Sequence, residues 1–264
     1  MRLPSTFSFA LSSAALLALL ALSTAACSIK IGDKTEGEKG AMSFAYDGPS
    51  CFFGCGLDRS ALQGAEVSIT AKGGDPEVSQ TVRVAESTIA RVSSQSETCS
   101  CDSSSGGSST SRSIETSAKC SSGETKSCSL SVGLETLAAG DARLEVMDFR
   151  GTVIDSVVVH VRPAARIDIS VNGKAFADGD VTTARVGDKL GLEAVPFDAS
   201  GDRALFTKHG ISHDYGDTTI VGPDDAVLFG STNTEDMVAR QPGDTTVKVH
   251  APGAERLVRF HVVP

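Results

Sequence analysis

Tryptophan is absent from the 264-residue sequence, and aromatic residues make up only 5% of it. Aromatic rings supply the stacking platforms of many sugar-binding sites and the anchors of large protein interfaces, so extensive surfaces of either kind are not expected. Basic residues are also in deficit, because 24 Lys and Arg stand against 33 Asp and Glu and leave a formal charge of −9. An acidic chain without a basic cluster argues against nucleic acid as a partner.

Catalytic and nucleotide-binding motifs are missing as well. The sequence contains no Gly-x-Ser-x-Gly elbow, no Walker loop and no dinucleotide fingerprint. The Ser-rich stretch of residues 93–113 has no nearby histidine to activate a hydroxyl, and carboxylates such as those of Asp178-Gly-Asp180 fall in turn sequences. The pair Asp224-Asp225 lacks the oxygen-rich spacing of calcium loops. We therefore predict that the protein is not an enzyme and holds no cofactor.

One long apolar run is present, Ala10–Leu22, and it follows a basic residue, Arg2. The run is too short to cross a bilayer as a helix, and the segment has the charged start, apolar centre and small-residue end of a secretory signal. Its last part, Leu22–Cys27, resembles the lipobox of bacterial lipoproteins. The resemblance implies that residues 1–26 are a signal peptide, and that Cys27 becomes the first residue and carries fatty acids such as palmitate. Ordinary secretion is the alternative.

A lipidated Cys27 would anchor the protein in the cell envelope with a lipid bilayer as its first partner. Residues 27–45 are polar, rich in Gly, Lys and Glu and without a period, so they are predicted to form a flexible tether. Ser28 follows the cysteine, where an Asp tends to retain bacterial lipoproteins at the inner membrane. By the same resemblance, the outer membrane is expected.

Six cysteines remain after Cys27 is assigned to the anchor: Cys51, Cys55, Cys99, Cys101, Cys120 and Cys128. An even number in an oxidising compartment predicts three disulfides. We expect Cys120 and Cys128 to close a local loop, and Cys51 and Cys55 to reach Cys99 and Cys101. A zinc cluster is the alternative, although only Cys51-x₃-Cys55 has a spacing typical of such sites.

Alternation of apolar and polar residues predicts β-strands in both halves of the chain. The inward-facing sets are Val67, Ile69 and Ala71; Val82 and Val84; Leu130 and Val132; Leu144 and Val146; Val157, Val159 and Val161; Ile167, Ile169 and Val171; Leu190 and Leu192; Val247 and Val249; and Val258, Phe260 and Val262. Asn172-Gly173 is typical of a tight hairpin turn. Residues 93–113 are nearly all small and polar, so they are predicted to be a surface loop held by its cysteines. Residues 207–236 are predicted to be a second long loop.

The two halves repeat at a spacing of about a hundred residues, the size of an immunoglobulin-type sandwich. Ala139–Val146, a turn at Gly151 and a last strand ending His160-Val161 correspond to Pro242–Val249, a turn at Gly253 and a strand ending His261-Val262. This pattern resembles the closing hairpin of bacterial immunoglobulin-like (Big-type) domains, and Ser87–Val92 is similar to a strand in the middle of those domains. The resemblance implies an all-β protein of two tandem immunoglobulin-like β-sandwiches, over residues 46–163 and 164–264.

Metal ligands gather at one place only, where His209, His213 and Asp214 lie within six positions of one another. Imidazole nitrogens and a carboxylate would suit a divalent metal ion, although the surrounding glycines equally indicate a solvated loop. The sequence therefore predicts a lipid-anchored envelope protein with a structural or adhesion-like, non-catalytic role and an envelope protein or polysaccharide as its partner. A metal-dependent binding module and an accessory subunit of an envelope enzyme are the alternatives.

Overall fold

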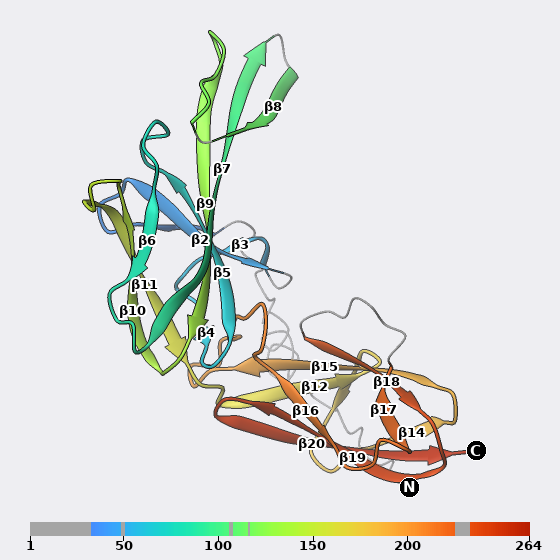
Figure 1. The fold of residues 1–264 in the computed structure, drawn as a ribbon. Helices are drawn as coiled ribbons and strands as arrows, with labels where there is room; N and C mark the ends of the chain where they lie inside the picture. The colour runs from blue at the N-terminus through green and yellow to red at the C-terminus, as the bar shows by residue number, and fades with distance from the viewer. Residues whose placement is uncertain (1–32, 49–50, 106–107, 116, 225–232) are drawn as a thin grey trace, which may run out of the picture. The chain divides into compact units, whose positions relative to one another are not determined.

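The computed structural model describes residues 33–48, 51–105, 108–115, 117–224 and 233–264. The leader, the lipobox and Cys27 lie outside the described residues. Every regular element of the described part is a β-strand, and no helix there has the length and apolar character needed to span a membrane. The described strands form four sheets, which pair into two β-sandwiches (Figure 1).

The first sandwich contains the elements from β1 to β11. Its larger sheet has the order β1-β2-β5-β9-β7-β8, with β3 also paired to β2, and the smaller sheet has the order β4-β11-β10-β6. The bounds in the larger sheet are β1 Thr35–Glu36, β2 Met42–Gly48, β3 Cys51–Cys55, β5 Glu66–Gly73, β7 Ala90–Ser105, β8 Ser108–Ile114 and β9 Thr125–Thr136. Those in the smaller sheet are β4 Ala61–Leu62, β6 Thr81–Val84, β10 Gly140–Met147 and β11 Val153–Arg162.

The second sandwich contains the elements from β12 to β20. One sheet has the order β13-β12-β15-β18-β17 and the other the order β14-β20-β19-β16. The bounds are β12 Arg166–Val171, β13 Lys174–Phe176, β14 Val181–Arg185, β15 Lys189–Phe197, β16 Ser212–Tyr215, β17 Val221–Pro223, β18 Thr234–Ala239, β19 Gly243–Ala251 and β20 Ala254–Val263.

The two sandwiches share one topology. The order β2-β5-β9-β7 in the first corresponds to β12-β15-β18-β17 in the second, and β4-β11-β10-β6 corresponds to β14-β20-β19-β16. In both, a short strand pairs in parallel with the last strand, and the remaining strands are antiparallel. This is the A-B-E-D and G-F-C arrangement of immunoglobulin-type sandwiches with one added strand beside G. The prediction of an all-β, immunoglobulin-like fold is confirmed.

Alternating apolar residues form the two cores, as expected from the period-two pattern. In β5, Val67, Ile69 and Ala71 are at most 1% exposed, and the corresponding apolar residues of β15, Leu190 and Leu192, are at most 3% exposed. The two cores meet at the border of the sandwiches, since Leu62 packs in the second core and Leu205 in the first. The described residues therefore belong to one compact unit, Ile31–Pro264.

The predicted tether ends earlier than residue 45. Residues 42–45 belong to β2, and Met42 and Phe44 are buried in the core of the first sandwich. The polar turn before them is fixed by Asp155, a fully buried carboxylate on β11. It accepts backbone N–H groups of Lys39 and Ala41 at 2.8 Å and of Met42 at 2.7 Å. The Gly- and Lys-rich composition suggested flexibility, but a carboxylate more than a hundred positions away orders this segment.

Two predicted loops also contain strands. Residues 93–113 form most of β7 and part of β8, and residues 207–236 contain β16, β17 and the first part of β18. In contrast, the predicted hairpin at Asn172-Gly173 is confirmed: both residues have positive φ, 50° and 73°, between the paired strands β12 and β13. A two-residue turn with both φ angles positive matches the twist of the flanking strands.

Candidate functional site

Three chain connections lie at one end of the first sandwich, which we call the loop end. They are the β5–β6 connection, the extended β7–β8–β9 part of the sheet, and the β10–β11 turn. Strand registers place them together, because Met147 at the end of β10 lies opposite Thr81 at the start of β6. Two of them, the β5–β6 and β10–β11 connections, correspond to the B–C and F–G connections that carry antigen-binding loops in antibody variable domains. Connections in general are where a sandwich can vary its binding surface.

The most prominent feature of the loop end is a disulfide-linked extension of the larger sheet. We call it the stapled extension; it comprises Cys99–Ser105 of β7, all of β8 and Thr125–Cys128 of β9. Figure 1 shows these strands continuing past the end of β5. Its sequence is rich in serine and poor in apolar residues, so the backbone ladder and the disulfides must hold it rather than a hydrophobic core.

The disulfides differ from the predicted pairing. Cys99 is bonded to Cys128, with their Cα atoms 4.1 Å apart, and Cys101 is bonded to Cys120. The expected local loop from Cys120 to Cys128 is therefore wrong, as are bonds from Cys51 and Cys55 to Cys99 and Cys101. The physical reason is the register of the long strands, which places Cys99 directly opposite Cys128.

Disulfide formation as such is confirmed for these four cysteines, and Cys55 is disulfide-bonded as well. Among the described residues, the groups of three or more ligand-type side chains close enough to share a metal ion each include two disulfide sulfurs. Their sulfur atoms are committed to each other, so the zinc alternative has no support from this part of the chain.

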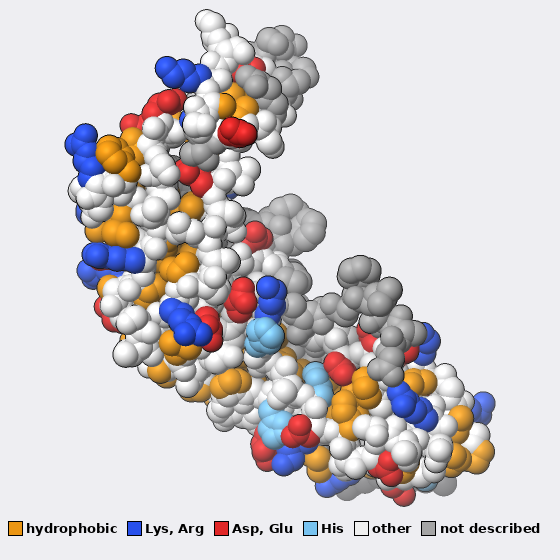
Figure 2. Space-filling view, in the orientation of Figure 1, with side chains coloured by type: hydrophobic (Ala, Val, Ile, Leu, Met, Phe, Trp, Pro, Cys, Tyr) orange, Lys and Arg blue, Asp and Glu red, His pale blue; other side chains and the backbone are white. Residues whose placement is uncertain are grey.

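The outer face of the stapled extension presents hydroxyl groups. The hydroxyl oxygens of Ser100 and Ser127 lie 3.0 Å apart, and the hydroxyl of Ser127 donates to the Asp102 carboxylate at 2.9 Å. Hydrogen bonds from Ser111 and Ser127 lower the pKa of Asp102 below its ordinary value. In Figure 2 the described residues of this part of the molecule are mainly white, the colour of the backbone and of side chains that are neither charged nor hydrophobic.

A cleft of about 350 Å³ lies where the stapled extension meets the β5–β6 connection. Lys72, Gly73, Gly74 and Pro76 line one side, and Lys126–Ser129 of β9 line the other. The volume is within the range of small-ligand sites in proteins, about 300–1,000 Å³. The two lysines are the only charged residues among its lining residues.

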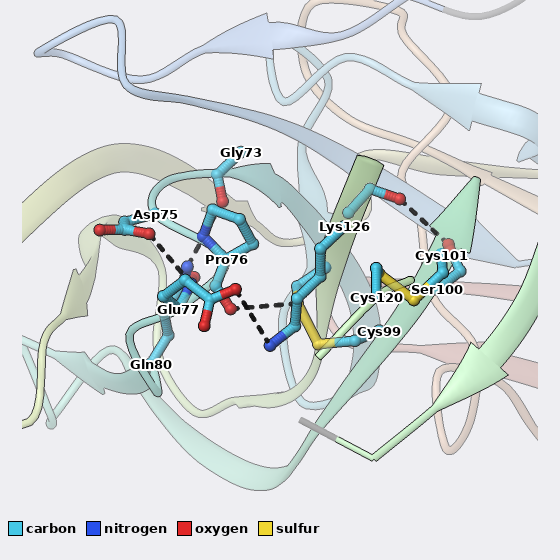
Figure 3. The surroundings of a disulfide bond; sticks show 12 residues. Gly73, Asp75, Pro76, Glu77, Gln80, Cys99, Ser100, Cys101, Cys120 and Lys126 are labelled. Atoms are coloured by element: carbon cyan, nitrogen blue, oxygen red, sulfur yellow. Dashed lines mark hydrogen bonds and ion pairs between the residues drawn. A yellow bond between two sulfur atoms is a disulfide. The ribbon is translucent and has the colours of Figure 1, made fainter. Parts of the chain in front are cut away.

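Lys126 extends from the inner face of β9 beside the Cys99–Cys128 disulfide (Figure 3). Its side chain is only 6% exposed, and its ammonium nitrogen lies 3.9 Å from a carboxylate oxygen of Glu77, which is 60% exposed. The disulfide sulfur of Cys128 lies 3.8 Å from the carbonyl oxygen of Pro76. The wall of the cleft therefore combines a cation with an apolar disulfide and a proline ring.

The β5–β6 connection holds its shape through local contacts. The Asp75 carboxylate accepts the N–H of Glu77 at 2.9 Å, and the Gln80 amide donates to the carbonyl of Gly73 at 3.4 Å. Gly73 has a φ of 118°, and a Cβ there would lie 2.6 Å from the carbonyl oxygen of Ala41. Only glycine fits at this point, so the direction in which the chain leaves β5 is fixed.

The β10–β11 turn presents the most exposed large apolar side chain of the described residues, Phe149, at 69% exposure. The Asp148 carboxylate holds the turn by accepting the N–H groups of Arg150 at 2.9 Å and Thr152 at 2.8 Å. The Arg150 guanidinium lies 5.0 Å from the centre of the Phe149 ring, within cation–π distance. An aromatic ring held out by a rigid turn is a typical anchor of a protein interface.

The predicted metal ligands do not come together. His213 and Asp214 are consecutive residues of β16 and so point to opposite faces of the sheet, while His209 is exposed before that strand with a φ of 58°. The Asp214 carboxylate bonds His250 of the neighbouring strand at 2.8 Å. The interpretation of this segment as a metal site is therefore wrong, because a strand separates residues that a loop could have gathered.

His213 lies instead in a polar cluster between the sheets of the second sandwich. Its Nδ1 atom is 3.7 Å from Glu235, and the Tyr215 hydroxyl donates to the same carboxylate at 2.7 Å. Burial lowers the pKa of His213, with the Glu235 and Asp214 charges acting in the opposite direction. Burial and the hydrogen bond to Glu235 raise the pKa of Tyr215 far above its usual range.

The other histidines also face carboxylates. His160 bonds Asp141 at 2.9 Å, and the corresponding pair in the second sandwich, His261 and Asp244, bonds at 2.6 Å. Both are cross-strand pairs on exposed sheet faces. They provide no arrangement for activating a hydroxyl or thiol nucleophile.

No protein-family model matches the sequence, and no curated protein matches it. Solved structures with some likeness include the adhesin FdeC of Escherichia coli, at 12% identity over 88% of this chain and 66% of that chain, with a TM-score of 0.31. The adhesin InvE of Yersinia pseudotuberculosis gives 13% identity over 88% and 61%, with a TM-score of 0.31. Domains 4 and 5 of the surface-layer protein SbsC give 13% identity over 70% and 77%, with a TM-score of 0.28. These scores are too low to carry an argument, so the fold rests on the strand order and the function on the loop end.

The sequence favoured two long segments as places to meet a partner, residues 93–128, which include the stapled extension, and residues 207–236, but sequence reasoning missed the β5–β6 connection and the β10–β11 turn. The sequence Asp148-Phe149-Arg150-Gly151 is a turn signal with an aromatic residue in it, which was a usable indication of an exposed ring. Nothing in the sequence indicated that Lys126 would be nearly buried, because its burial depends on the register of β7 and β9 and on the β5–β6 connection above it.

Proposed function

We propose that this protein is a lipid-anchored, non-catalytic binding protein of the cell envelope, and that the loop end of its first sandwich is its binding surface. One observation carries the proposal: an exposed aromatic ring, Phe149, a cleft of about 350 Å³ and a disulfide-linked extension occur together at the same end of one sandwich. Disulfides favour an oxidising compartment, in agreement with export from the cytosol.

The anchor is proposed from the resemblance of Leu22–Cys27 to a lipobox. Because β1 begins at Thr35, the segment between a lipidated Cys27 and the first strand is shorter than the expected tether of residues 27–45. At about 3.3–3.6 Å per extended residue, it spans no more than about 30 Å, so the first sandwich stays close to the membrane. We further propose the outer membrane as its location and two tandem domains, divided near residues 163 and 164.

The anchor is tested by replacing Cys27 with alanine. We expect the unaltered protein in the membrane fraction with an intact mass that includes acyl chains, whereas Cys27→Ala is released without that mass. A Ser28→Ala variant is the matched control and should remain in the membrane fraction. A wild-type chain without acyl mass would refute lipid anchoring, whatever the loop end binds.

The binding surface is tested by site-specific photo-crosslinking in cells. A photoreactive phenylalanine analogue at Phe149 should capture an envelope partner, because this ring is exposed and rigidly held. The same analogue at Leu257, which is 42% exposed on the second sandwich, is the matched control and should capture none. Equal capture at the two positions would contradict the assignment to the loop end.

A further inference from the structure

The two neighbours of β9, strands β5 and β7, are paired with it over different lengths. β9 pairs with β7 along the whole length of β9, from Thr125 opposite Asp102 to Thr136 opposite Ala90. On the other side of β9, the ladder with β5 stops at Lys72 opposite Ser129. The chain then leaves the sheet at Gly73 and crosses to β6 in the smaller sheet. The cleft thus occupies the position that a continuation of β5 would take.

The backbone of β9 is oriented toward this position. Directly opposite residues of antiparallel strands are either about 5.5 Å apart and hydrogen-bonded to each other, or about 4.5 Å apart with their N–H and C=O groups pointing away from each other. The Cα distance of 4.1 Å assigns Cys99 and Cys128 to the second kind. Cys128 therefore directs its N–H and C=O groups to the side of β5, where the register places Gly73, the last residue of β5. Lys126, two residues before Cys128, has the same orientation and faces the position beyond the end of β5. Thr136, an even number of residues further along, confirms this alternation, since its N–H donates to Ala65 at 2.9 Å.

The charges beside this position select a type of partner. The protein as a whole is acidic, but the charged residues lining the cleft are both lysines. A carboxylate beside them, that of Glu77, is 3.9 Å from the Lys126 ammonium, and the Glu77 side chain is 60% exposed. Lys72 belongs to the outer face of the sheet and Lys126 to the inner face, so a strand lying between them meets one ammonium group on each side. Opposite charges on neighbouring strands stabilise the pair by about 0.2–1 kcal/mol.

We propose that the cleft binds an extended acidic segment of a partner protein, which adds to the larger sheet as a strand antiparallel to β9 and continues the position of β5. This assignment deepens the proposed function, on which it rests, by naming the mode of binding and the chemistry of the partner. Backbone hydrogen bonds to β9 provide the affinity, as in other cases of strand addition. Carboxylates of the segment pair with the exposed Lys72 and share Lys126 with Glu77, while its small apolar residues pack on the disulfide and Pro76.

The experiment uses the purified full-length mature protein and a short fluorescein-labelled peptide in which valine and glutamate alternate. Fluorescence anisotropy should report binding with a Kd below about 1 mM. The same peptide with lysine in place of glutamate should bind at least severalfold more weakly. A peptide with methyl groups on alternate backbone nitrogens keeps its charge but loses the donors of the ladder, and should lose about tenfold or more.

Two variants locate the contact. Lys126→Met keeps the apolar stem and removes the charge, and should weaken binding about 1.4- to 5-fold. Lys72→Met should weaken binding by a similar factor. Because Lys72 is exposed, this substitution should not affect folding. Lys174→Met, on the exposed edge strand of the second sandwich, is the matched control and should leave the Kd unchanged. Hydrogen exchange with bound peptide should show added protection at residues 125–129.

Three results would overturn the assignment: no binding of the acidic peptide up to about 1 mM, equal binding of the methylated peptide, or protection at β8 instead of residues 125–129. Each of these can occur while Phe149 still captures a partner in cells, in which case strand addition fails and the proposed binding surface stands. If Phe149 captures no partner but the peptide binds as expected, the cleft is supported and the β10–β11 turn is removed from the binding surface.

Discussion

Asp155 orders the start of the folded chain, and replacing it with asparagine gives a sharp test of this assignment. Each carboxylate oxygen accepts two backbone N–H groups: Oδ1 those of Lys39 and Ser156, and Oδ2 those of Ala41 and Met42, at 2.7–2.8 Å. An amide has one oxygen, so in either orientation its NH₂ group faces two N–H donors. The substitution therefore loses two hydrogen bonds to a charged acceptor.

The expected cost follows from these contacts. Hydrogen bonds to a charged group contribute about 1.5–3 kcal/mol each, so the Asp155→Asn variant should be destabilised by at least about 3 kcal/mol. For a chain of this size, each kcal/mol lowers the Tm by about 2–4 °C, which predicts a fall of at least about 6 °C in thermal unfolding followed by circular dichroism. Asp168→Asn is the matched control: its carboxylate is 54% exposed and faces only Arg166, at 3.2 Å, so the effect should stay within about 0.5 kcal/mol.

The same contacts give a pH dependence. Burial alone would raise the pKa of Asp155, but the four N–H donors outweigh it and hold the pKa below its ordinary value. A carboxylate with a lowered pKa stabilises the fold above the unfolded-state pKa of about 3.9 and loses this contribution as the pH falls through the folded-state pKa. The Tm difference between the wild type and Asp155→Asn should therefore be constant near neutral pH and shrink below about pH 4. A variant with an unchanged Tm at pH 7 would refute the role assigned to Asp155.

Three further predictions concern the disulfides and the cores. Replacing Cys99 and Cys128 together with alanine should cost about 2–4 kcal/mol, and hydrogen exchange should show faster opening in the stapled extension while β10 and β11 remain protected. Gly210→Ala should destabilise by about 1–3 kcal/mol in urea unfolding, because its Cβ would lie 2.6 Å from the ring of Phe206. Leu134→Ala should cost about 2–5 kcal/mol, since this side chain is fully buried on β9; a loss below about 1 kcal/mol would contradict its place in the core.

The strands that the sequence predicted are those whose own side chains alternate. Val157, Val159 and Val161 of β11 and Ile167 and Ile169 of β12 are buried as the pattern indicated. For these strands, local sequence and tertiary packing favour the same structure, so reading the period was sufficient.

The strands that the sequence did not predict depend on distant partners. In β2 the apolar residues Met42 and Phe44 do alternate, but they directly follow a polar turn whose N–H donors are satisfied by Asp155 on β11. In β7, the serines of the outer face hide the period, and the buried side of the extension is formed by Cys99 and Cys101 rather than by aliphatic residues. Hydrophobic periodicity does not reveal strands that are held by backbone hydrogen bonds and disulfides rather than by apolar side chains.

The cleft could not be predicted for a related reason. It exists because β9 is twelve residues long and β5 only eight, and strand ends of this kind are set by where a glycine such as Gly73 lets the chain turn out of the sheet. The metal hypothesis was wrong because residues close in the sequence are not close in the structure. His213 and Asp214 are consecutive, but their side chains lie on opposite faces of the sheet.

The equal topology of the two sandwiches has a practical consequence for protein engineering. Between β7 and β9 the first copy accommodates a whole additional hairpin, whereas the equivalent strands of the second copy, β17 and β18, are only three and six residues long. An insertion at this connection leaves the order of the other strands unchanged, as comparison of the two copies demonstrates. We therefore expect a hairpin grafted between β17 and β18 to leave the strand order of the second sandwich intact.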